Sequence, residues 1–258
     1  MNLSTGTQQA ELLAALRLLH VSGVGPVTYR RLIRVFGSPE AALSAPLERL
    51  LEVPDVGTAV AEGVRRAPRD CWAQEELERA AERGVRLVGL KDPSYPKALL
   101  NTYDPPPVLY IQGEFQETDA LAIAIVGARQ CTPYGRRTAQ RLAGELAAAG
   151  FTIVSGLARG IDTAAHASAL ESPGGRTLAV LGNGLGSVYP PENRALHDRI
   201  VAGRGSVFSE LPLDTPPASE HFPRRNRIIA GLSLGVVVVE GRESSGALIT
   251  ARYAVDMD

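Results

Sequence analysis

Residues 121–154 read LAIAIVGARQCTPYGRRTAQRLAGELAAAGFTIV, and this stretch decides the fold class. Two short apolar runs, residues 121–126 and 151–154, flank a segment near 134–149 that has a helical composition. Continuous rather than alternating apolar runs are typical of parallel strands that are buried on both faces. The same alternation continues, with expected strands at 177–181, 207–209 and 235–239 and expected helices near 160–171, 192–202, 224–233 and 245–255. The sequence therefore predicts a doubly wound, mostly parallel, extended Rossmann-like α/β sheet.

The residues before this sheet follow a different, helical pattern. Four leucines recur at helical spacing: Leu12, Leu13, Leu16 and Leu19. Two glycine turns follow, at Gly25 and Gly57, and each precedes a segment that we expect to be a helix. This repetition predicts a duplicated helix–hairpin–helix. We therefore expect a small all-α domain, SAM-like or helix–hairpin–helix, over residues 1–68 and an extended Rossmann-like domain over residues 69–258.

Composition places the chain among ordinary globular proteins, with 45 % hydrophobic and 21 % charged residues. No run approaches the ~18 apolar residues that a membrane span needs, and the N-terminus lacks the pattern of a signal peptide. The two cysteines, Cys71 and Cys131, do not have metal-ligand spacing. We expect a cytoplasmic protein with no membrane partner and no metal site. Because the net charge is −1, any electrostatic site must be a local cluster of charge.

The loops after the predicted strands are the candidate site, because ligands of doubly wound sheets bind beyond the carboxyl ends of the strands. Glycine lets the backbone approach a ligand closely, a helix N-terminus favours an anion, and arginine adds formal charge. Five such loops combine small residues with Arg, Asn or Ser, and together they predict an anion-binding rim. The candidate ligand-binding residues are Arg129, Ser155, Gly156, Arg159, Gly160, Asn183, Gly184, Arg224, Arg225, Asn226, Arg227, Ser245 and Gly246.

Nucleotide cofactors are not indicated by these loops. A dinucleotide requires G-x-G-x-x-G between strand and helix, but only Gly127 and Gly135 follow the first parallel strand. The glycines of residues 182–186 have the wrong spacing, and no P-loop is present. We therefore expect no cofactor, no catalytic residue and a binding rather than an enzymatic function.

Longer strings in the same loops resemble the DprA family (DNA-processing protein A, also called Smf). The matching strings are IVGAR (125–129), SGLARGIDTAAH (155–166), AVLGNGL (179–185), YP (189–190), FPRRNRIIAGLS (222–233) and SGALITA (245–251). The resemblance covers residues 85–258, and the N-terminal region resembles the SAM-like or helix–hairpin–helix domain that often precedes them. It implies a homodimer that binds single-stranded DNA, protects incoming DNA and loads the RecA recombinase in natural transformation and recombination.

The resemblance also implies roles for individual residues. Arg129 is expected to be the principal phosphate-contacting arginine, and Ser155, Gly156 and Gly160 are expected to line the pocket as donors. Residues 224–227 are expected to belong to the same rim.

Two departures from the family pattern stand out. Residues 184–188, GLGSV, lack the lysine that many relatives carry before the Tyr-Pro pair. The chain also ends at Asp258, where relatives continue, so we expect a C-terminal truncation relative to the family.

Several alternatives stay open. A phosphoribohydrolase-like enzyme would carry a catalytic Glu where aligning Gly246 with its motif places Thr250, and a nucleotide-sensing module is a third possibility. The second hairpin carries Asp55 in place of a glycine, so the helical domain could contact DNA or protein.

Four polar or aromatic side chains admit more than one role. His166 is expected to be packed or hydrogen-bonded rather than catalytic, while Asp162 could cap a helix or touch a ligand. Tyr110 and Tyr134 could stack bases, although packing is the preferred interpretation.

Overall fold

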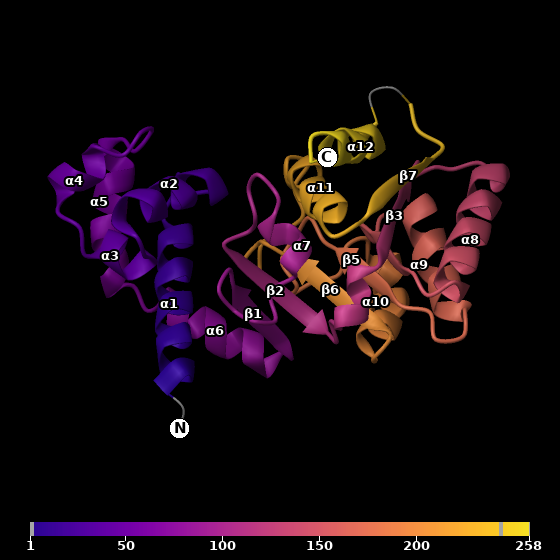
Figure 1. The fold of residues 1–258 in the computed structure, drawn as a ribbon, viewed down its shortest axis with the longest axis horizontal. Helices are drawn as coiled ribbons and strands as arrows, with labels where there is room; N and C mark the ends of the chain where they lie inside the picture. The colour runs from indigo at the N-terminus through magenta and orange to yellow at the C-terminus, as the bar shows by residue number, and fades with distance from the viewer. Residues whose placement is uncertain (1–2, 243–244, 258) are drawn as a thin grey trace. The chain divides into compact units, whose positions relative to one another are not determined.

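The computed structural model describes residues 3–242 and 245–257. The chain divides into two compact units. The first comprises Met1–Arg83, Leu87–Tyr95 and Asp104–Leu109. The second comprises Gly84–Arg86, Pro96–Tyr103 and Tyr110–Asp258. The ribbon of Figure 1 gives the labels of the elements used below.

The first unit contains the helical region expected from the sequence. Its helices are α1 (Leu3–His20), α2 (Pro26–Phe36), α3 (Pro39–Leu43), α4 (Leu47–Leu51), α5 (Thr58–Arg66), η1 (Ala67–Arg69) and α6 (Trp72–Glu82). Pro26 occupies the first turn of α2, directly after the N-cap Gly25, where a missing backbone N–H costs nothing. The turns before α2 and α5 bury Val24 and Val56 in equivalent places. The predicted pair of helix–hairpin–helix motifs is thus observed.

The two hairpins differ at their left-handed residue. Gly23 has φ +88° in the first hairpin, whereas Asp55 takes this conformation in the second, with φ +62°. Asp is one of the few side chains that tolerates the left-handed region. The Asp55 carboxylate forms an ion pair with Arg31 of α2, and Arg31 Nη1 also donates to Pro54 O at 3.4 Å. Asp55, which stands where the first hairpin has a glycine, therefore links the second hairpin to α2.

A seven-stranded sheet runs through the rest of the chain in the order β1-β2-β6-β5-β4-β3-β7. The strands are β1 (Val85–Gly89), β2 (Val108–Gly113), β3 (Ala122–Gly127), β4 (Thr152–Ser155), β5 (Thr177–Val180), β6 (Gly205–Ser209) and β7 (Gly235–Val239). The neighbours from β6 to β7 pair in parallel, and β2 pairs antiparallel with β6. The predicted doubly wound, mostly parallel sheet is confirmed.

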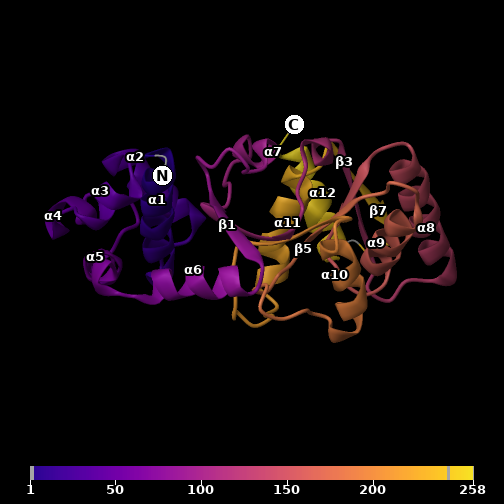
Figure 2. The same ribbon diagram turned by 90° about the horizontal axis from the view of Figure 1, so that it is seen from below.

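Helices cover both faces of this sheet, as Figures 1 and 2 show. One layer contains α8 (Pro133–Ala148), α9 (Ile161–Glu171) and α10 (Arg194–Val201). The other contains α11 (His221–Gly231) and α12 (Gly246–Val255), with α7 (Lys97–Leu100) beside α11. The short helix η2 (Glu117–Ala120) lies between β2 and β3, and η3 (Pro191–Asn193) directly precedes α10. Within the described residues, none of the helices combines the length and apolar composition of a membrane span.

Small side chains allow α8 and α9 to pack closely on the sheet. Alanines recur at every fourth position of α8: Ala139, Ala143 and Ala147. They pack with Ala165 and Ala169 of α9 and with Ile125 and Ile153 of the strands. Because the helices lie so close, Ser168 Oγ of α9 donates to Gln140 O of α8 at 2.7 Å. The layer is therefore held by apolar contact and by hydrogen bonds between the helices.

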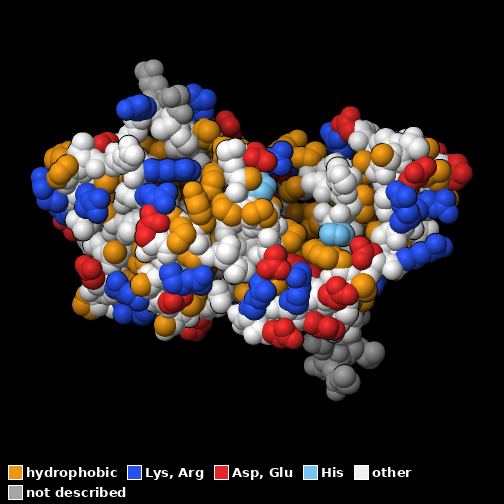
Figure 3. Space-filling model, turned by 180° about the vertical axis from the view of Figure 1, so that it is seen from behind, with side chains coloured by type: hydrophobic (Ala, Val, Ile, Leu, Met, Phe, Trp, Pro, Cys, Tyr) orange, Lys and Arg blue, Asp and Glu red, His pale blue; other side chains and the backbone are white. Residues whose placement is uncertain are grey.

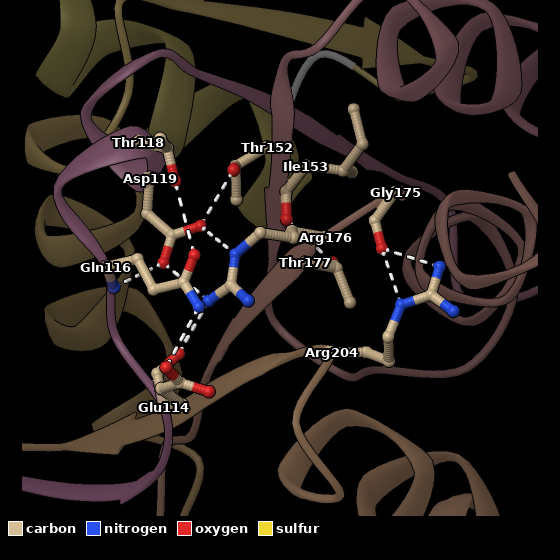
Figure 4. Close-up of polar contacts among 10 residues, drawn as sticks. All are labelled: Glu114, Gln116, Thr118, Asp119, Thr152, Ile153, Gly175, Arg176, Thr177 and Arg204. Carbon is tan, nitrogen blue, oxygen red and sulfur yellow. Dashed lines mark hydrogen bonds and ion pairs between the residues drawn. The ribbon is translucent and has the colours of Figure 1, made fainter. Parts of the chain in front are cut away.

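A buried ion pair closes the amino ends of β4 and β5, and Figure 4 shows its partners. Asp119 of η2 is 1 % exposed and accepts from Arg176 Nε at 2.7 Å and Arg176 Nη2 at 2.8 Å. Thr152 Oγ1 donates to the same carboxylate at 2.8 Å, and Gln116 N does so at 2.8 Å. Each carboxylate oxygen is thus satisfied, as a buried charge requires. This end of the sheet is sealed by internal contacts.

Candidate functional site

The opposite, carboxyl ends of the parallel strands converge on a small pocket. Three loops supply its walls, and α11 closes it. The lining residues are Arg129, Gly156, Ala158, Arg159, Gly182, Tyr189, Pro190 and Phe222. Arg129 follows β3, Arg159 follows β4, and Tyr189 lies in the loop after β5. Of the five predicted loops, those after β3, β4 and β5 thus meet at this edge of the sheet, whereas the described part of the loop after β7 contributes no lining residue.

Two guanidinium groups and two aromatic rings form a row across the pocket. Arg129 Cζ lies 5.0 Å from the centroid of the Phe222 ring, and Arg159 Cζ lies 6.0 Å from that of Tyr189. The two rings lie 5.8 Å apart, with 35° between their planes. Cations within about 6 Å of a ring face are attracted by its quadrupole. We call this row, Arg129–Phe222–Tyr189–Arg159, the Arg–aromatic row.

The two arginines of the row differ in their charge partners. Arg159 forms an ion pair with Glu192 of η3, in which Arg159 Nη2 donates to Glu192 Oε2 at 3.2 Å. Both side chains are about half exposed. The hydrogen bond from Arg159 holds the pKa of Glu192 below its usual range. Among the described residues no carboxylate is paired with Arg129, so Arg129 keeps its charge available to a ligand.

A helix is predicted near 224–233, and α11 begins three residues earlier, at His221. From residue 225 to residue 230 the helix is enclosed by the protein on all sides, so Arg224 is exposed while the next three side chains are buried. Arg225 Nη1 donates to Gly156 O at 2.9 Å and to Val180 O. Burial lowers the pKa of Arg225 to about 10, although the charge of Asp162 opposes this shift. Arg225 therefore joins the loops after β4 and β5 from inside the protein.

The other inward residues of this group also have internal partners. Arg227 Nη2 donates to Glu210 at 2.5 Å, and Asn226 Nδ2 donates to Gly246 O at 2.9 Å. In the loop after β5, Asn183 Nδ2 donates to Ser187 O at 2.8 Å. These side chains were candidates for ligand contact, and the structure places them in contacts that shape the loops.

Backbone N–H groups of the loop after β4 are hydrogen-bonded within the protein. Gly156 N and Ala158 N donate to Asp162 Oδ2 at 3.0 Å and 3.3 Å, and Ser155 Oγ donates to Ile125 O at 2.6 Å. Burial raises the pKa of Asp162, while the charge of Arg225 opposes the shift. Asp162 does not cap the start of α9, where no side-chain cap is present, and it instead accepts from the backbone of the loop before that helix. The donors expected at Ser155 and Gly156 are engaged within the protein.

His166 completes this internal network. Leu157 N donates to His166 Nε2 at 3.3 Å, so the ring proton is on Nδ1, which lies 2.7 Å from Thr177 Oγ1. Burial, and then the charge of Arg225, lowers the pKa of His166 to about 3. The expected hydrogen-bonded histidine is confirmed, and it holds the loop as a neutral ring.

Two glycines of the predicted set are required by close backbone approach. Gly160 has φ +75°, and a Cβ there would collide with the carbonyl oxygens of Ala128 and Arg129. A Cβ at Gly184 would collide with the carbonyl oxygens of Pro212 and Leu213. Gly160 thus fixes the backbone that carries Arg129, which is a structural reason for glycine there.

The remaining candidates lie outside the pocket lining. Ser245 is the N-cap of α12 and Gly246 is its first residue. The pocket also includes residues that the sequence analysis did not select, Tyr189 and Phe222. The signal available for both was an aromatic residue directly before a proline within the matching strings. Of the tyrosines considered instead, Tyr110 is buried at 2 % exposure, whereas Tyr134 is 74 % exposed and does not pack in the core.

Charge is not segregated on the one face of the molecule that Figure 3 shows. Acidic and basic side chains are interspersed there, and neither sign dominates. This pattern agrees with the net charge of −1. A polyanion would therefore be held by a local cluster such as the Arg–aromatic row rather than by a general field.

These features define a class of protein: a Rossmann-like domain with an arginine-lined pocket at the carboxyl ends of its strands, preceded by helix–hairpin–helix motifs. Comparison with known families agrees, because residues 86–258 match the family described as DNA recombination-mediator protein A. Residues 9–77 match the DprA-like N-terminal HHH domain. The chain belongs to the DprA/Smf family of DNA recombination-mediator proteins.

Relatives from distant bacteria are similar over most of the chain. Protein Smf of Synechocystis is 42 % identical over 91 % of this chain and 59 % of its own length. DNA processing protein DprA of Bacillus subtilis is 43 % identical over 68 % of this chain and 59 % of its own length. Protein Smf of Escherichia coli is 42 % identical over 72 % of this chain and 48 % of its own length. The chain thus spans about half to three fifths of the length of these relatives.

Two solved structures share the fold. DprA from Streptococcus pneumoniae has a TM-score of 0.81 and 31 % identity, covering 95 % of this chain and 83 % of that one. DNA processing protein A from Helicobacter pylori, described for its unique single-stranded DNA binding mode, has a TM-score of 0.59 and 34 % identity. That comparison covers 67 % of this chain and 77 % of the other.

Proposed function

We propose that this chain binds single-stranded DNA at the Arg–aromatic row and does not catalyse a reaction there. The observation that carries the proposal is a pair of neighbouring rings with a guanidinium group over each of them, all in one pocket. Proteins that hold single strands without sequence preference combine a positive track for phosphates with aromatic platforms for bases. The single-stranded DNA binding described for the Helicobacter pylori relative supports the same assignment.

The arginines and the aromatic rings at the pocket are proposed to contact different parts of the strand. Arg129, which has no carboxylate partner among the described residues, is proposed to contact phosphate. Arg224 is exposed on α11 and is proposed to extend the positive track. Glu192 occupies the Nε–Nη2 edge of Arg159, so a phosphate can take that edge only after Glu192 gives way. Phe222 and Tyr189 are proposed to stack on bases.

The enzymatic alternative finds no support at its key position. Alignment with a phosphoribohydrolase motif places Thr250 where the catalytic Glu would be. Thr250 is 1 % exposed, and its hydroxyl donates to Gly246 O at 3.4 Å. A buried hydroxyl with an internal acceptor cannot replace a carboxylate as a general base. An HPLC assay for base release from a nucleoside monophosphate is therefore expected to show none.

Single strands are expected to bind more tightly than duplex DNA. The pocket offers rings to base faces, and these faces are exposed in a flexible single strand but stacked within a duplex. A competition gel with labelled poly-dT measures this, using unlabelled poly-dT and a duplex of equal length as competitors. Equal competition by the duplex would contradict the proposal. Sequence preference is expected to be slight, because phosphate contacts carry no direct sequence information.

Replacement of Phe222 by leucine is expected to weaken binding of poly-dT without changing its salt dependence. Loss of one stacked base costs about 1–3 kcal/mol, or roughly 5- to 150-fold in affinity, while no charge is removed. Fluorescence anisotropy at several salt concentrations measures both quantities. Tyr134→Leu is the matched control, since Tyr134 is an exposed aromatic residue on α8 and lies outside the pocket. An unchanged affinity for Phe222→Leu would remove this ring from the site.

We further propose that the chain assembles as a homodimer and loads RecA recombinase onto the bound strand, as the family resemblance implies. Light scattering tests the first statement, and a pull-down with purified RecA in the presence of poly-dT tests the second. A monomer at tens of micromolar, or no RecA retained on the protein–DNA complex, would contradict the corresponding part.

A further inference from the structure

The N-terminus of α8 is occupied by a carboxylate of the chain itself. Glu240 follows β7 and reaches across to the residues that begin α8, 108 positions earlier. Thr132 N donates to its two oxygens at 3.0 Å and 2.9 Å, and Thr132 Oγ1 donates at 2.9 Å. The pairing of β3 with β7 brings the two segments together, since Gly127 is opposite Val239.

This carboxylate completes the cap of α8. Pro133, the first residue of the helix, has no N–H, so the backbone donors at this end of the helix are those of Thr132, Tyr134 and Gly135. Gly135 N donates to Thr132 Oγ1 at 3.1 Å, and the Thr132 hydroxyl in turn donates a hydrogen bond to Glu240. A negative charge at this end of the helix is also favoured by the helix dipole.

The chain is shaped to admit Glu240 at this position. A Cβ at Gly135 would collide with Glu240 Oε2, so glycine is needed for the carboxylate to approach. Glu240 has φ +58°, a conformation that non-glycine residues seldom adopt. Such a cost persists only where the surrounding contacts maintain it, and here those contacts are the three hydrogen bonds to Thr132.

Nucleotide-binding domains of this architecture use the same place for a different group. In a Rossmann domain the phosphate of the nucleotide sits at the N-terminus of the helix that follows the first parallel strand. In this chain the first parallel strand is β3, the following helix is α8, and the carboxylate of Glu240 fills the position. An incoming phosphate would meet the like charge of Glu240 and two backbone N–H groups, those of Thr132 and Gly135, that already have acceptors.

We propose that Glu240 is a specificity-determining residue, a built-in anion that excludes the phosphate of free mononucleotides from the N-terminus of α8. The inference deepens the proposed function, on which it rests: phosphates of a single strand are taken at the Arg–aromatic row, and the usual nucleotide position is closed. Glu240 thus prevents the domain from binding a free nucleotide at α8, while the Arg–aromatic row stays open to a single strand.

The test compares phosphate binding by the parent chain and by Glu240→Ala. Thermal unfolding is followed in increasing inorganic phosphate, and then in adenosine monophosphate, at constant ionic strength. Removal of the carboxylate is expected to tighten phosphate binding about tenfold, seen as a phosphate-dependent rise in Tm that is larger than the one the Arg–aromatic row gives the parent. Glu145→Ala is the matched control, because Glu145 is an exposed carboxylate in the last turn of α8, at the end of the helix away from Glu240.

Three outcomes decide the inference. Equal phosphate dependence in the parent and in Glu240→Ala overturns it. If the alanine variant does not fold, Glu240→Gln keeps the shape and removes the charge, and an unchanged phosphate response again overturns the inference. The gain must persist in the double variant Arg129→Ala/Glu240→Ala, since otherwise the phosphate binds at the Arg–aromatic row. Loss of poly-dT binding in the parent would refute the proposed function and leave this comparison intact.

Discussion

Replacement of Arg129 by alanine is expected to weaken binding of poly-dT by roughly 10- to 100-fold, because one charge-assisted contact is worth about 1.5–3 kcal/mol. Arg129 has no carboxylate partner among the described residues, so no internal ion pair has to be broken before it contacts a phosphate. The slope of log affinity against log salt is expected to flatten by about 0.7, the value for one lost contact to a single-strand phosphate. Anisotropy titrations at several salt concentrations measure both effects.

Two further variants make this result specific. Arg129→Lys restores the charge but not the bidentate geometry of the guanidinium, so it is expected to recover only part of the lost affinity. Arg199→Ala removes the same charge from the exposed last turn of α10 and is expected to change little. An Arg129→Ala protein that melts like the parent and binds poly-dT with unchanged affinity and salt slope would exclude Arg129 from the site. A joint loss of Tm and affinity would instead assign Arg129 a structural role.

Stability is expected to fall as the pH is lowered below about 6.5, and His166 is expected to contribute much of this fall. Its pKa is lowered from 6.5 to about 3 in the folded protein. Between these values the unfolded chain binds a proton that the folded chain does not, so the free energy of unfolding decreases as the pH falls. The slope from this residue is about 1.4 kcal/mol per pH unit.

The measurement is urea unfolding of the parent and of His166→Gln at several pH values. Glutamine cannot take up the proton, so the stability of the parent is expected to drop by roughly 2 kcal/mol more than that of the variant between pH 6.5 and pH 5. The comparison uses the change with pH, so a constant cost of the substitution cancels. Parallel curves for the two proteins would show that His166 does not govern the acid sensitivity.

Buried partners also decide which arginines can reach a ligand. Arg225 and Arg227 belong to the same matching string as Arg224, yet both are buried, because the protein encloses α11 on all sides over residues 225–230. Arg225 joins two loops through their carbonyl oxygens, while Arg224 stays exposed. We expect the exposed arginine to alter affinity when it is replaced, and the buried pair to alter stability first.

Local sequence determined the architecture and the place of the pocket. Continuous apolar runs predict buried parallel strands wherever they lie, and parallel strands bring their carboxyl ends to one edge of the sheet. That reasoning correctly placed the loops of Arg129 and Arg159 at one pocket. The matching strings already contained Tyr189 and Phe222, but their pairing into a row depends on two loops meeting in space.

Only the tertiary structure decided which polar groups remain free for a ligand. Gly156 N and Ala158 N are taken by Asp162, Arg159 is shared with Glu192 from 33 positions away, and Thr132 is taken by Glu240 from 108 positions away. Strand and helix signals arise from neighbours along the chain. Competition for a donor is settled by whichever acceptor the fold brings within about 3 Å, and such acceptors have no fixed spacing in the sequence.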